Sequence, residues 1–323
     1  MARPKVIITR KLPEAAELRA RELFDVELNA ADTQLDAAGL ARAMREADGL
    51  IPCVADKITA ELLAASGRRV KIVSNYGVGY NNIDVDAAKA NGVVVTNTPD
   101  VLTEDTADLA LTLMLATARR AGEGEREVRS GKWTGWRPTH MLATRVNGKT
   151  LGLIGIGRIG RAVARRAHHG FGMRVLYHDP FPLSDAEAAS IGAERRESIE
   201  AVLAESDFVS LHCPATPETK HLMNAARFAQ MRKGAILINT ARGDVVNEGD
   251  LIDALRSGAI AGAGLDVFEK EPVVPDALKG MENVVLLPHL GSATMETRVA
   301  MGMRALDNLE AFFGGRAPRD RVA

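Results

Sequence analysis

The sequence has few cysteines, no long apolar run and almost no net charge. Its 323 residues include two cysteines, Cys53 and Cys213, which lie far apart and outside any paired motif. This spacing argues against a disulfide framework and against a thiolate metal site, so we expect no bound metal. Lysine and arginine total 41, against 42 aspartate and glutamate residues. Such a balance removes the electrostatic case for a nucleic-acid partner or an anionic membrane surface.

The apolar segments are too short to cross a membrane. The most apolar run, 109–118, contains two threonines and falls well short of the roughly 20 residues that a crossing requires. Residues 1–9 have no long apolar core before Arg10 and Lys11, so they predict a first strand rather than a secretory signal. We therefore expect a cytoplasmic protein with no membrane partner, in a compartment that keeps both cysteines reduced.

Short β-branched runs alternate with helical patterns along nearly the whole chain. This alternation and the length predict an α/β protein with two doubly wound parallel-sheet domains. We assign residues 1–100 and 291–323 to a smaller, flavodoxin-like substrate-binding domain, and residues 101–290 to a Rossmann-type dinucleotide-binding domain. The pattern alone does not say on which half a last helix at about 294–313 packs, and our assignment places it with the first domain.

Each domain has its own series of predicted elements. The first series has strands at 6–9, 49–53, 71–74 and 93–96, with helices between them such as 13–24 and 59–65. The second begins with a buried helix at 103–120 and continues through a less regular stretch from 121 to 147. Its six predicted strands lie at 151–154, 174–177, 208–212, 235–239, 261–264 and 284–287. Six strands suffice for a full doubly wound sheet.

A glycine motif follows the first strand of the second series. Gly155, Gly157 and Gly160 come directly after the apolar strand 151–154 and open a predicted helix at 158–169. Glycines alone also mark turns, but this strand-turn-helix context is the one that binds a dinucleotide pyrophosphate. Without a side chain, Gly157 lets the backbone approach the pyrophosphate at the helix N-terminus, and Gly160 allows close helix-sheet packing.

An acidic residue ends the next strand. Asp179 follows Gly160 by 19 residues, close to the spacing of about 20 expected for a ribose-binding acid. A carboxylate there accepts from the ribose hydroxyls and repels a 2′-phosphate, so we predict NAD as the preferred coenzyme. The arginines at 158, 161, 165 and 166 weaken this preference and keep NADP as the alternative. The alternative to a ribose-binding role for Asp179 is a solvated turn acid before Pro180.

Three chemically suitable residues follow predicted strands in separate loops: Arg242 in NTARGD, Glu271 in DVFEKEP and His289 in LLPHLGSAT. The carboxyl ends of parallel strands are where open α/β sheets bind ligands. Taken singly, each residue is explained better by a structural role: a surface ion pair for Arg242, a solvated turn acid for Glu271 and a satisfied histidine after a core strand for His289. Together they supply a fixed cation, a proton donor and an acid that keeps the donor charged, as reduction of a 2-oxo acid demands.

At these residues the sequence resembles the D-isomer-specific 2-hydroxyacid dehydrogenase family, and the resemblance covers nearly the whole chain. The matching stretches are SNYGVGYNNID, TNTPDVLTEDTADLAL, GKTLGLIGIGRIG, INTARGDVVNEGDL, AGAGLDVFEKEP and LPHLGSAT. Within the family the chain is similar to glyoxylate and hydroxypyruvate reductases. The resemblance therefore implies NAD(P)H-dependent reduction of a small 2-oxo acid to the 2-hydroxy acid.

The resemblance also implies a role for each matching residue. Arg242 anchors the substrate, His289 is the catalytic acid/base and contacts substrate and coenzyme, and Glu271 pairs with His289. A loop is implied to bind the substrate carboxylate through backbone amides, and it consists of Tyr76, Gly77, Val78 and Gly79. Besides the glycine motif, Asp179, Arg242 and His289, the implied cofactor contacts are Thr106, Arg158, Ile159, Cys213, Pro214, Thr240, Ala241, Asp266 and Ser292.

The family usually forms dimers, so the resemblance implies a homodimer. The segment Trp133–Trp136 matches one that reaches a partner's substrate pocket in related enzymes, although ordinary interface packing explains it equally well. Two other functions stay open. The chain could be a phosphoglycerate or D-lactate dehydrogenase of the same family, or a dinucleotide-sensing binding module similar to corepressors that resemble the family. The near-neutral charge argues against the binding module.

Overall fold

The computed structural model describes residues 3–323, which form two α/β units. One unit contains the described residues up to Leu102 together with Ser292–Ala323, and the other contains Thr103–Gly291. The chain thus divides after residues 102 and 291, whereas the sequence analysis divides it after 100 and 290. Residues 1 and 2 of the predicted first domain lie outside the described residues.

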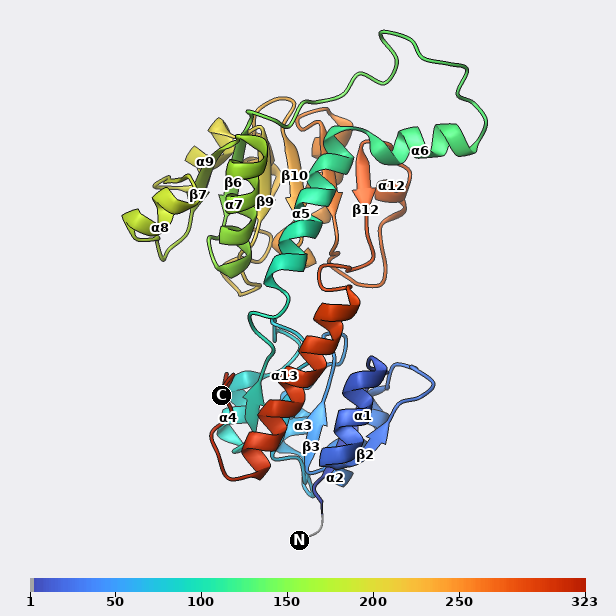
Figure 1. Ribbon diagram of the computed structural model, residues 1–323, viewed down its shortest axis with the longest axis vertical. Coiled ribbons are helices and arrows are strands. Elements are labelled where there is room, and N and C mark those ends of the chain that lie inside the picture. Colours follow the sequence, from blue (N-terminus) through green and yellow to red (C-terminus); the bar gives the residue numbers. More distant parts are fainter. Residues whose placement is uncertain (1–2) are drawn as a thin grey trace. The chain divides into compact units, whose positions relative to one another are not determined.

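The first unit is built on a parallel sheet whose strand order, within the described residues, is β2-β1-β3-β4-β5 (Figure 1). This order is the flavodoxin-like one. Its strands are β1 (Lys5–Ile8), β2 (Asp25–Leu28), β3 (Gly49–Ile51), β4 (Ile72–Ser74) and β5 (Val94–Thr96). Its helices are α1 (Glu14–Leu23), α2 (Ala37–Glu46), α3 (Ala60–Ala64), α4 (Val85–Ala90) and α13 (Met295–Phe313).

Helix α13 brings the end of the chain back to the first unit. The Thr294 side chain caps this helix by accepting from the Thr297 amide, and the Ala305 carbonyl accepts a 2.9 Å hydrogen bond from the Ser74 hydroxyl on β4. Beyond α13 the chain runs antiparallel beside β5, where the Val322 amide donates to the Val95 carbonyl. The last helix therefore packs on the half to which we assigned it.

The second unit carries a parallel sheet of seven strands among the described residues, in the order β12-β11-β10-β9-β6-β7-β8. This is the Rossmann order extended by one strand. The strands are β6 (Thr150–Ile154), β7 (Arg174–His178), β8 (Ala193–Arg195), β9 (Phe208–Leu211), β10 (Ile236–Asn239), β11 (Gly262–Leu265) and β12 (Val284–Leu286). The helices are α5 (Thr103–Ala118), α6 (Ala121–Arg129), α7 (Arg158–Phe171), α8 (Asp185–Ser190), α9 (Ile199–Glu205), α10 (Ala225–Phe228), α11 (Glu248–Arg256) and α12 (Asp276–Lys279).

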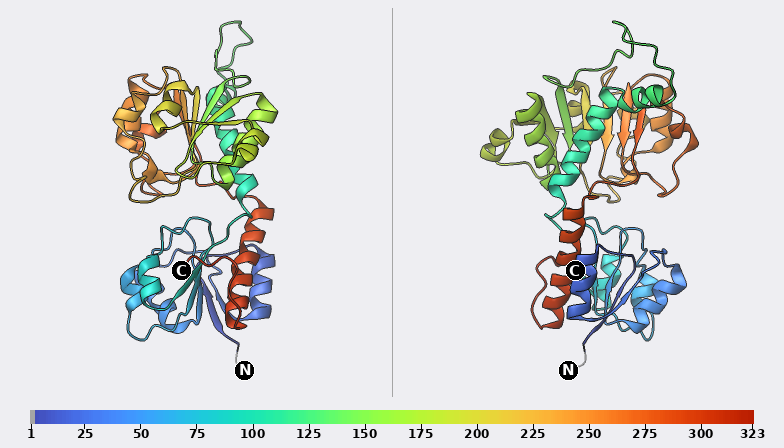
Figure 2. Two further views of the ribbon diagram at one scale, coloured as in Figure 1. Left: turned by 90° about the vertical axis from the view of Figure 1, so that its left-hand side faces the viewer. Right: turned by 45° about the vertical axis from the view of Figure 1, so that its right-hand side comes forward.

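Helices cover both faces of this sheet, as Figure 2 shows. Leu151 and Leu153 of β6 point to the face covered by α5 and α7, whereas Ile154 points to the core under α9 and α11. Helix α5 approaches β11 closely because two strand positions are glycine. A Cβ on Gly264 would lie 3.0 Å from both Leu113 Cβ and Thr117 Oγ1 of the helix.

The α/β class and the two doubly wound sheets are confirmed, but two strands and the stretch after residue 120 differ from the prediction. The first sheet has five strands instead of four and the second has seven instead of six, because β2 and β8 are not predicted. Both are short edge strands with partly exposed polar residues and no apolar run. Helix α6 lies in the stretch predicted to be irregular, and it buries none of its residues.

Within the described residues, no helix combines the length and apolar character of a membrane crossing. The same part of the chain contains no group of three or more histidine, cysteine or acidic side chains that could hold a metal ion.

Candidate active site

In the glycine-rich turn after β6, close contacts leave no room for a side chain at two of the three glycines. Gly155 has φ of +96°, and a Cβ there would lie 2.7 Å from the carbonyl carbon of His212. A Cβ on Gly160 would lie 2.5 Å from the Gly155 carbonyl oxygen. At Gly157, in contrast, a Cβ would meet nothing within 4 Å. The backbone at the N-terminus of α7 therefore faces open space, flanked by the exposed Arg158 and half-buried Ile159, as a pyrophosphate site requires.

Asp179 lies beside this turn, just after β7. Its Oδ2 accepts from the Ile156 amide at 2.8 Å and its Oδ1 accepts from the Phe181 amide at 2.8 Å. Cys213, after β9, lies near enough that burial, with a contribution from the Asp179 charge, raises the pKa of its thiol to about 11. The next residue, Pro214, is exposed. The structure thus gathers the predicted pyrophosphate and adenosine contacts at the ends of β6, β7 and β9.

Asn239 holds the loop that carries Arg242. This buried residue ends β10, and its side chain accepts from the Ala241 amide at 3.0 Å and donates to the Arg242 carbonyl at 2.9 Å. The Arg242 guanidinium donates to the Ala241 carbonyl at 2.7 Å. Burial lowers the pKa of Arg242, although the negative charges of Glu271 and Asp244 oppose the shift. Arginine stays protonated even so, and the loop presents a fixed cation.

The Arg242 loop touches the loop after β11 backbone to backbone. A Cβ on Gly243 would lie 1.9 Å from the carbonyl carbon of Phe268, so only glycine allows this approach. A second contact joins the same segments reciprocally, because the Glu269 side chain accepts from the Glu248 amide and the Glu248 side chain accepts from the Glu269 amide. The two loops are therefore held in register.

Glu271 and His289 form a direct pair. The Oε2 atom of Glu271 lies 2.8 Å from Nδ1 of His289, and its Oε1 accepts from the Phe268 amide at 3.1 Å. Burial by itself raises the pKa of Glu271, but the hydrogen bond to His289 and the charge of that side chain outweigh it and lower the pKa overall. About a third of each side chain is exposed, at 35 % and 31 %. The pair is thus an anionic carboxylate that orients an accessible imidazole.

The backbone of His289 is held in an unusual conformation. Its φ is +56°, in the left-handed region that non-glycine residues seldom occupy. The His289 amide donates to the Asp266 carbonyl at 2.9 Å, and the buried Asp266 carboxylate accepts from the amides of Leu290 and Gly291. Burial raises the pKa of Asp266. Backbone strain of this kind gathers at functional sites and persists only where the surroundings impose it.

Two threonines that the resemblance places at the cofactor lie on this unit. Thr106, buried on α5, donates to the Gly291 carbonyl at 2.9 Å, so it connects that helix to the segment after His289. The Thr240 hydroxyl is buried and has no hydrogen-bond partner among the described residues. An unsatisfied buried hydroxyl is costly unless a ligand completes it. Together with the open space at Gly157, it shows that the residues present fit a bound dinucleotide.

The remaining predicted residues belong to the first unit. Tyr76 is buried and its hydroxyl donates to the Arg298 carbonyl at 2.6 Å, while burial raises the pKa of the phenol to about 12. The carbonyls of the next three residues accept from the Thr98 amide, the Asn97 side chain and the Asn75 side chain. Across the described residues no hydrogen bond uses the amides of Val78 and Gly79. Ser292, half-buried, also belongs to this unit.

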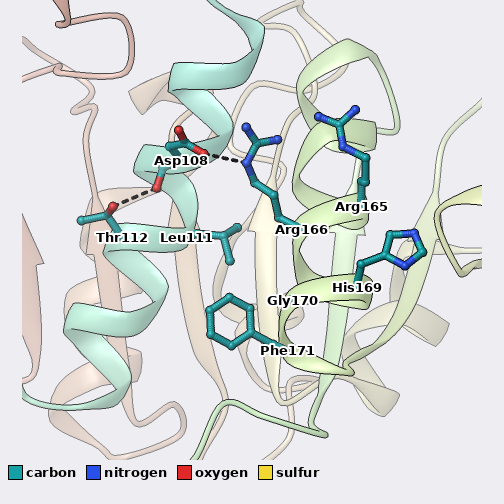
Figure 3. A pocket seen from close by; sticks show the side chains of 8 residues that line it. All are labelled: Asp108, Leu111, Thr112, Arg165, Arg166, His169, Gly170 and Phe171. Atoms are coloured by element: carbon teal, nitrogen blue, oxygen red, sulfur yellow. Dashed lines mark hydrogen bonds and ion pairs between the residues drawn. The ribbon is translucent and has the colours of Figure 1, made fainter.

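The surface of the second unit has hollows, of which one adjoins the catalytic pair. It has a volume of about 250 Å³ and is lined by Phe268, Glu271, Pro272, Val274, Leu286, Leu287, Pro288 and His289. Another, of about 570 Å³, lies between α5 and α7, where Asp108 accepts from Arg166 above the apolar Leu111 and Phe171 (Figure 3). None of the predicted site residues lines the second hollow.

The NAD binding domain model of the D-isomer specific 2-hydroxyacid dehydrogenases matches residues 111–291. The chain belongs to this family. A glyoxylate reductase from Thermococcus kodakarensis is 48% identical over 320 residues, which cover 98% of this chain and 95% of the relative. One from Pyrococcus furiosus is 47% identical, again over 98% of this chain and 94% of the relative.

Solved structures of similar proteins agree with this membership. The TT0316 protein from Thermus thermophilus has a TM-score of 0.89 at 44% identity, with 99% of this chain and 100% of that one covered. The NADPH-dependent glyoxylate/hydroxypyruvate reductase from Sinorhizobium meliloti, solved with NADP and malonate, has a TM-score of 0.88 at 37% identity, covering 100% and 97% of the two chains. This 2-hydroxyacid dehydrogenase is therefore an NAD(P)-dependent oxidoreductase, and its Rossmann unit is the dinucleotide-binding one.

Three asparagine side chains that hold the loops of this dehydrogenase are not among the residues predicted from the sequence. Asn75 and Asn239 are buried and Asn97 is half-buried, and the side chain of each donates a hydrogen bond to a loop carbonyl. Asparagine beside a strand end also favours an ordinary turn, so the residue type gave no distinguishing signal. Each of the three nevertheless lies in a stretch that matches the family: SNYGVGYNNID, TNTPDVLTEDTADLAL and INTARGDVVNEGDL.

Proposed function

We propose that the protein reduces glyoxylate or hydroxypyruvate to the corresponding 2-hydroxy acid with NADH or NADPH. The observation that carries this proposal is the 2.8 Å contact between Glu271 and His289, on the unit that also presents Arg242. A carboxylate, an imidazole and a guanidinium are the groups that a proton-coupled carbonyl reduction needs. The glyoxylate reductases among the relatives support the choice of a small substrate.

Each residue has a defined task in this reaction. His289 gives a proton to the oxygen that develops on C2, and Glu271 fixes the ring through Nδ1, leaving Nε2 for the substrate. Arg242 stabilises the negative charge on the same oxygen and on the carboxylate. The amides of Val78 and Gly79 supply donors for the substrate carboxylate. When bound, the dihydronicotinamide supplies the hydride.

We infer that NADH is preferred over NADPH. Asp179 supports this preference because its carboxylate lies beside the glycine turn and would repel a 2′-phosphate. We expect kcat/KM to be higher with NADH than with NADPH. Asp179→Asn should lower the ratio of these two values on the order of tenfold, which corresponds to ~1.4 kcal/mol of removed repulsion. Asp185→Asn, an exposed acid of α8, is the control. A wild-type preference for NADPH contradicts the assignment.

The most direct test of the reaction is a panel of 2-oxo acids assayed with both reduced coenzymes. We expect the highest kcat/KM for glyoxylate or hydroxypyruvate, with lower values for pyruvate and for 3-phosphohydroxypyruvate. A preference for either of the latter would indicate a D-lactate or phosphoglycerate dehydrogenase. Tight NADH binding by calorimetry without measurable turnover on any acid would instead indicate the binding module.

We also infer a homodimer and a cytoplasmic location. The segment after α6 exposes Trp133 and Trp136 at 54 % and 81 % of their surface, and exposed aromatic groups of this size mark protein contacts. Both cysteines are unpaired, and burial raises the pKa of each to about 11. Unreactive free thiols suit a reducing compartment.

A further inference from the structure

We propose that a buried cluster of Asn97, Asn308 and Asp320 positions the amides that bind the substrate carboxylate. The inference rests on the proposed function, because it concerns how the Val78 and Gly79 amides are aimed. None of the three residues needs to touch substrate for this role. They act through the backbone of the loop, so they are positioning residues.

The orientation of the Val78 and Gly79 amides follows from the geometry of a trans peptide. In such a peptide the carbonyl and the following amide point in opposite directions. The Thr98 amide donates to the Gly77 carbonyl at 3.0 Å, which turns the Val78 amide the other way. The Asn97 side chain donates to the Val78 carbonyl at 2.8 Å, which turns the Gly79 amide the other way. The two hydrogen bonds to the Gly77 and Val78 carbonyls thus direct the Val78 and Gly79 amides to the opposite side of the loop.

Asn97 is in turn held by groups from the end of the chain. Its amide donates to the Asp320 carbonyl at 3.2 Å, and its carbonyl accepts from the Asn308 side chain at 3.3 Å. Asn308 is 2 % exposed on α13, and Asp320 is 8 % exposed. These two residues bind each other twice, through Asn308 Nδ2 to Asp320 Oδ2 at 3.0 Å and through the Asp320 amide to Asn308 Oδ1 at 3.2 Å.

A charged pair fixes the position of Asp320. The Arg304 Nε atom lies 2.8 Å from Asp320 Oδ2, and its guanidinium also reaches Asp100 at 3.6 Å. Burying a carboxylate is costly unless it is paired and hydrogen-bonded, and Asp320 is both. The segment after α13 therefore holds Asn308 and Asn97 in place, and through them the peptide between Val78 and Gly79.

The test is a double-mutant cycle on the full-length enzyme with glyoxylate and NADH. We expect Asn97→Ala to raise KM for glyoxylate on the order of tenfold and Asn308→Ala to raise it about threefold, the effects of one lost hydrogen bond and of one loosened support. In both variants kcat and the Kd for NADH should stay within about twofold of wild type. The double variant should raise KM by less than the product of the two single effects, because both side chains support the same loop, Asn97 through its side chain and Asn308 through the Asn97–Thr98 peptide.

A second readout does not depend on turnover. Oxamate is a carboxylate of the same shape as a 2-oxo acid that cannot be reduced, and its Kd for the NADH complex, measured by calorimetry, should rise in parallel with KM. Asp307→Asn changes the exposed neighbour of Asn308 on α13 and serves as the control, with no expected change. If Asn97→Ala does not fold, the isosteric Asn97→Asp makes the same prediction, because it replaces the donor with an acceptor.

Two results overturn the inference. One is an unchanged KM and oxamate Kd in Asn97→Ala or Asn97→Asp with only a lower melting temperature, which would show a purely structural role. The other is strictly additive effects of the two alanine substitutions on KM. Both are distinguishable from failure of the proposed function itself, in which the wild-type enzyme would neither reduce glyoxylate nor bind oxamate.

Discussion

At the scale of single residues, a substitution in the Glu271–His289 pair is the most direct test of the proposed chemistry. His289→Ala should lower kcat at neutral pH by roughly 10²–10⁴, the usual contribution of general acid–base catalysis. The Kd for NADH should change little, because the variant removes a proton donor and leaves the glycine turn intact. His169→Ala, an exposed histidine on α7, should behave as wild type. Near-normal turnover of the His289 variant in a stopped-flow assay would rule out its assignment.

Arg242 should have a different kinetic signature. Arg242→Ala removes a fixed cation from the substrate, so kcat/KM for glyoxylate should fall by about 10²–10³, as for the loss of one stabilising donor at a developing oxyanion. NADH binding, followed by fluorescence titration, should be preserved within about twofold. A variant that loses NADH binding and glyoxylate turnover together would show that Arg242 serves mainly to hold the coenzyme or the fold.

His212 makes the stability of the protein depend on pH. The residue keeps some accessible surface, but its ring is buried deeply enough to lower its pKa from 6.5 to about 4. Between these two values the unfolded chain binds a proton that the folded chain does not, so stability must rise with pH through this window. The full effect is on the order of 3 kcal/mol, lost as pH falls from 6.5 towards 4.

The variant His212→Asn should remove this slope. We expect its free energy of unfolding in urea to lie below that of wild type at pH 7 and to converge with it, or exceed it, near pH 4.5. The Ser210 hydroxyl, which lies 2.9 Å from Nε2 in the wild type, loses this partner because the asparagine side chain is shorter, and this loss adds to the lower stability expected at pH 7. Parallel pH profiles for the two proteins would mean that His212 is protonated in the folded state across this range.

At the scale of elements, the contact between the Arg242 loop and the loop after β11 predicts an unequal response to one substitution at two glycines. Gly243→Ala forces a Cβ to 1.9 Å from the Phe268 backbone, so the loops must separate at a cost of at least ~2 kcal/mol. Gly170→Ala, on the exposed side of α7 with nothing within 4 Å, should instead stabilise by about 0.5–1 kcal/mol. Thermal melts and glyoxylate turnover of both variants provide the measurement. Normal activity in Gly243→Ala would contradict the close approach.

The elements also show what the sequence could and could not reveal. Buried strands such as β6 and β10 are short, mainly apolar runs between turn residues, and the short length and the flanking turns indicate a strand of a parallel sheet. The edge strand β8, with Glu194 and Arg195 exposed, has no such run, because one side of an edge needs no apolar partner. Helix α6 buries nothing, so no periodic apolar face distinguishes it from a loop.

The candidate site likewise contains residues that could be predicted from the sequence and residues that could not. The glycine turn, Asp179 and the three loop residues could be predicted because each has a chemical signature at a fixed distance from a strand. The supports of the site have no such signature. Asn308 reaches the carbonyl of Asn97 across 211 positions of sequence, and a contact between residues so far apart follows from the fold rather than from any local pattern. The roles of all these residues remain predictions until the variants are measured.

At the scale of the whole molecule, the exposed apolar side chains of one segment are the basis for the homodimer that we infer. In Figures 1 and 2 the segment after α6 stands away from the rest of its unit. Besides Trp133 and Trp136 it exposes Leu142 at 70 %. Apolar groups presented in this way are stabilised only when another surface covers them.

We therefore expect light scattering to give twice the chain mass of 34.6 kDa for the wild type at micromolar concentrations. Trp136→Ala should raise the dimer dissociation constant by about 30-fold, equivalent to the ~2 kcal/mol of a central aromatic contact. Phe181→Ala removes an aromatic that is equally exposed, at 84 %, but lies outside this segment, and it should leave the dissociation constant unchanged. A monomeric wild type, or equal effects of the two substitutions, would mean that this segment does not form the dimer contact, and the tryptophans would then need a different partner.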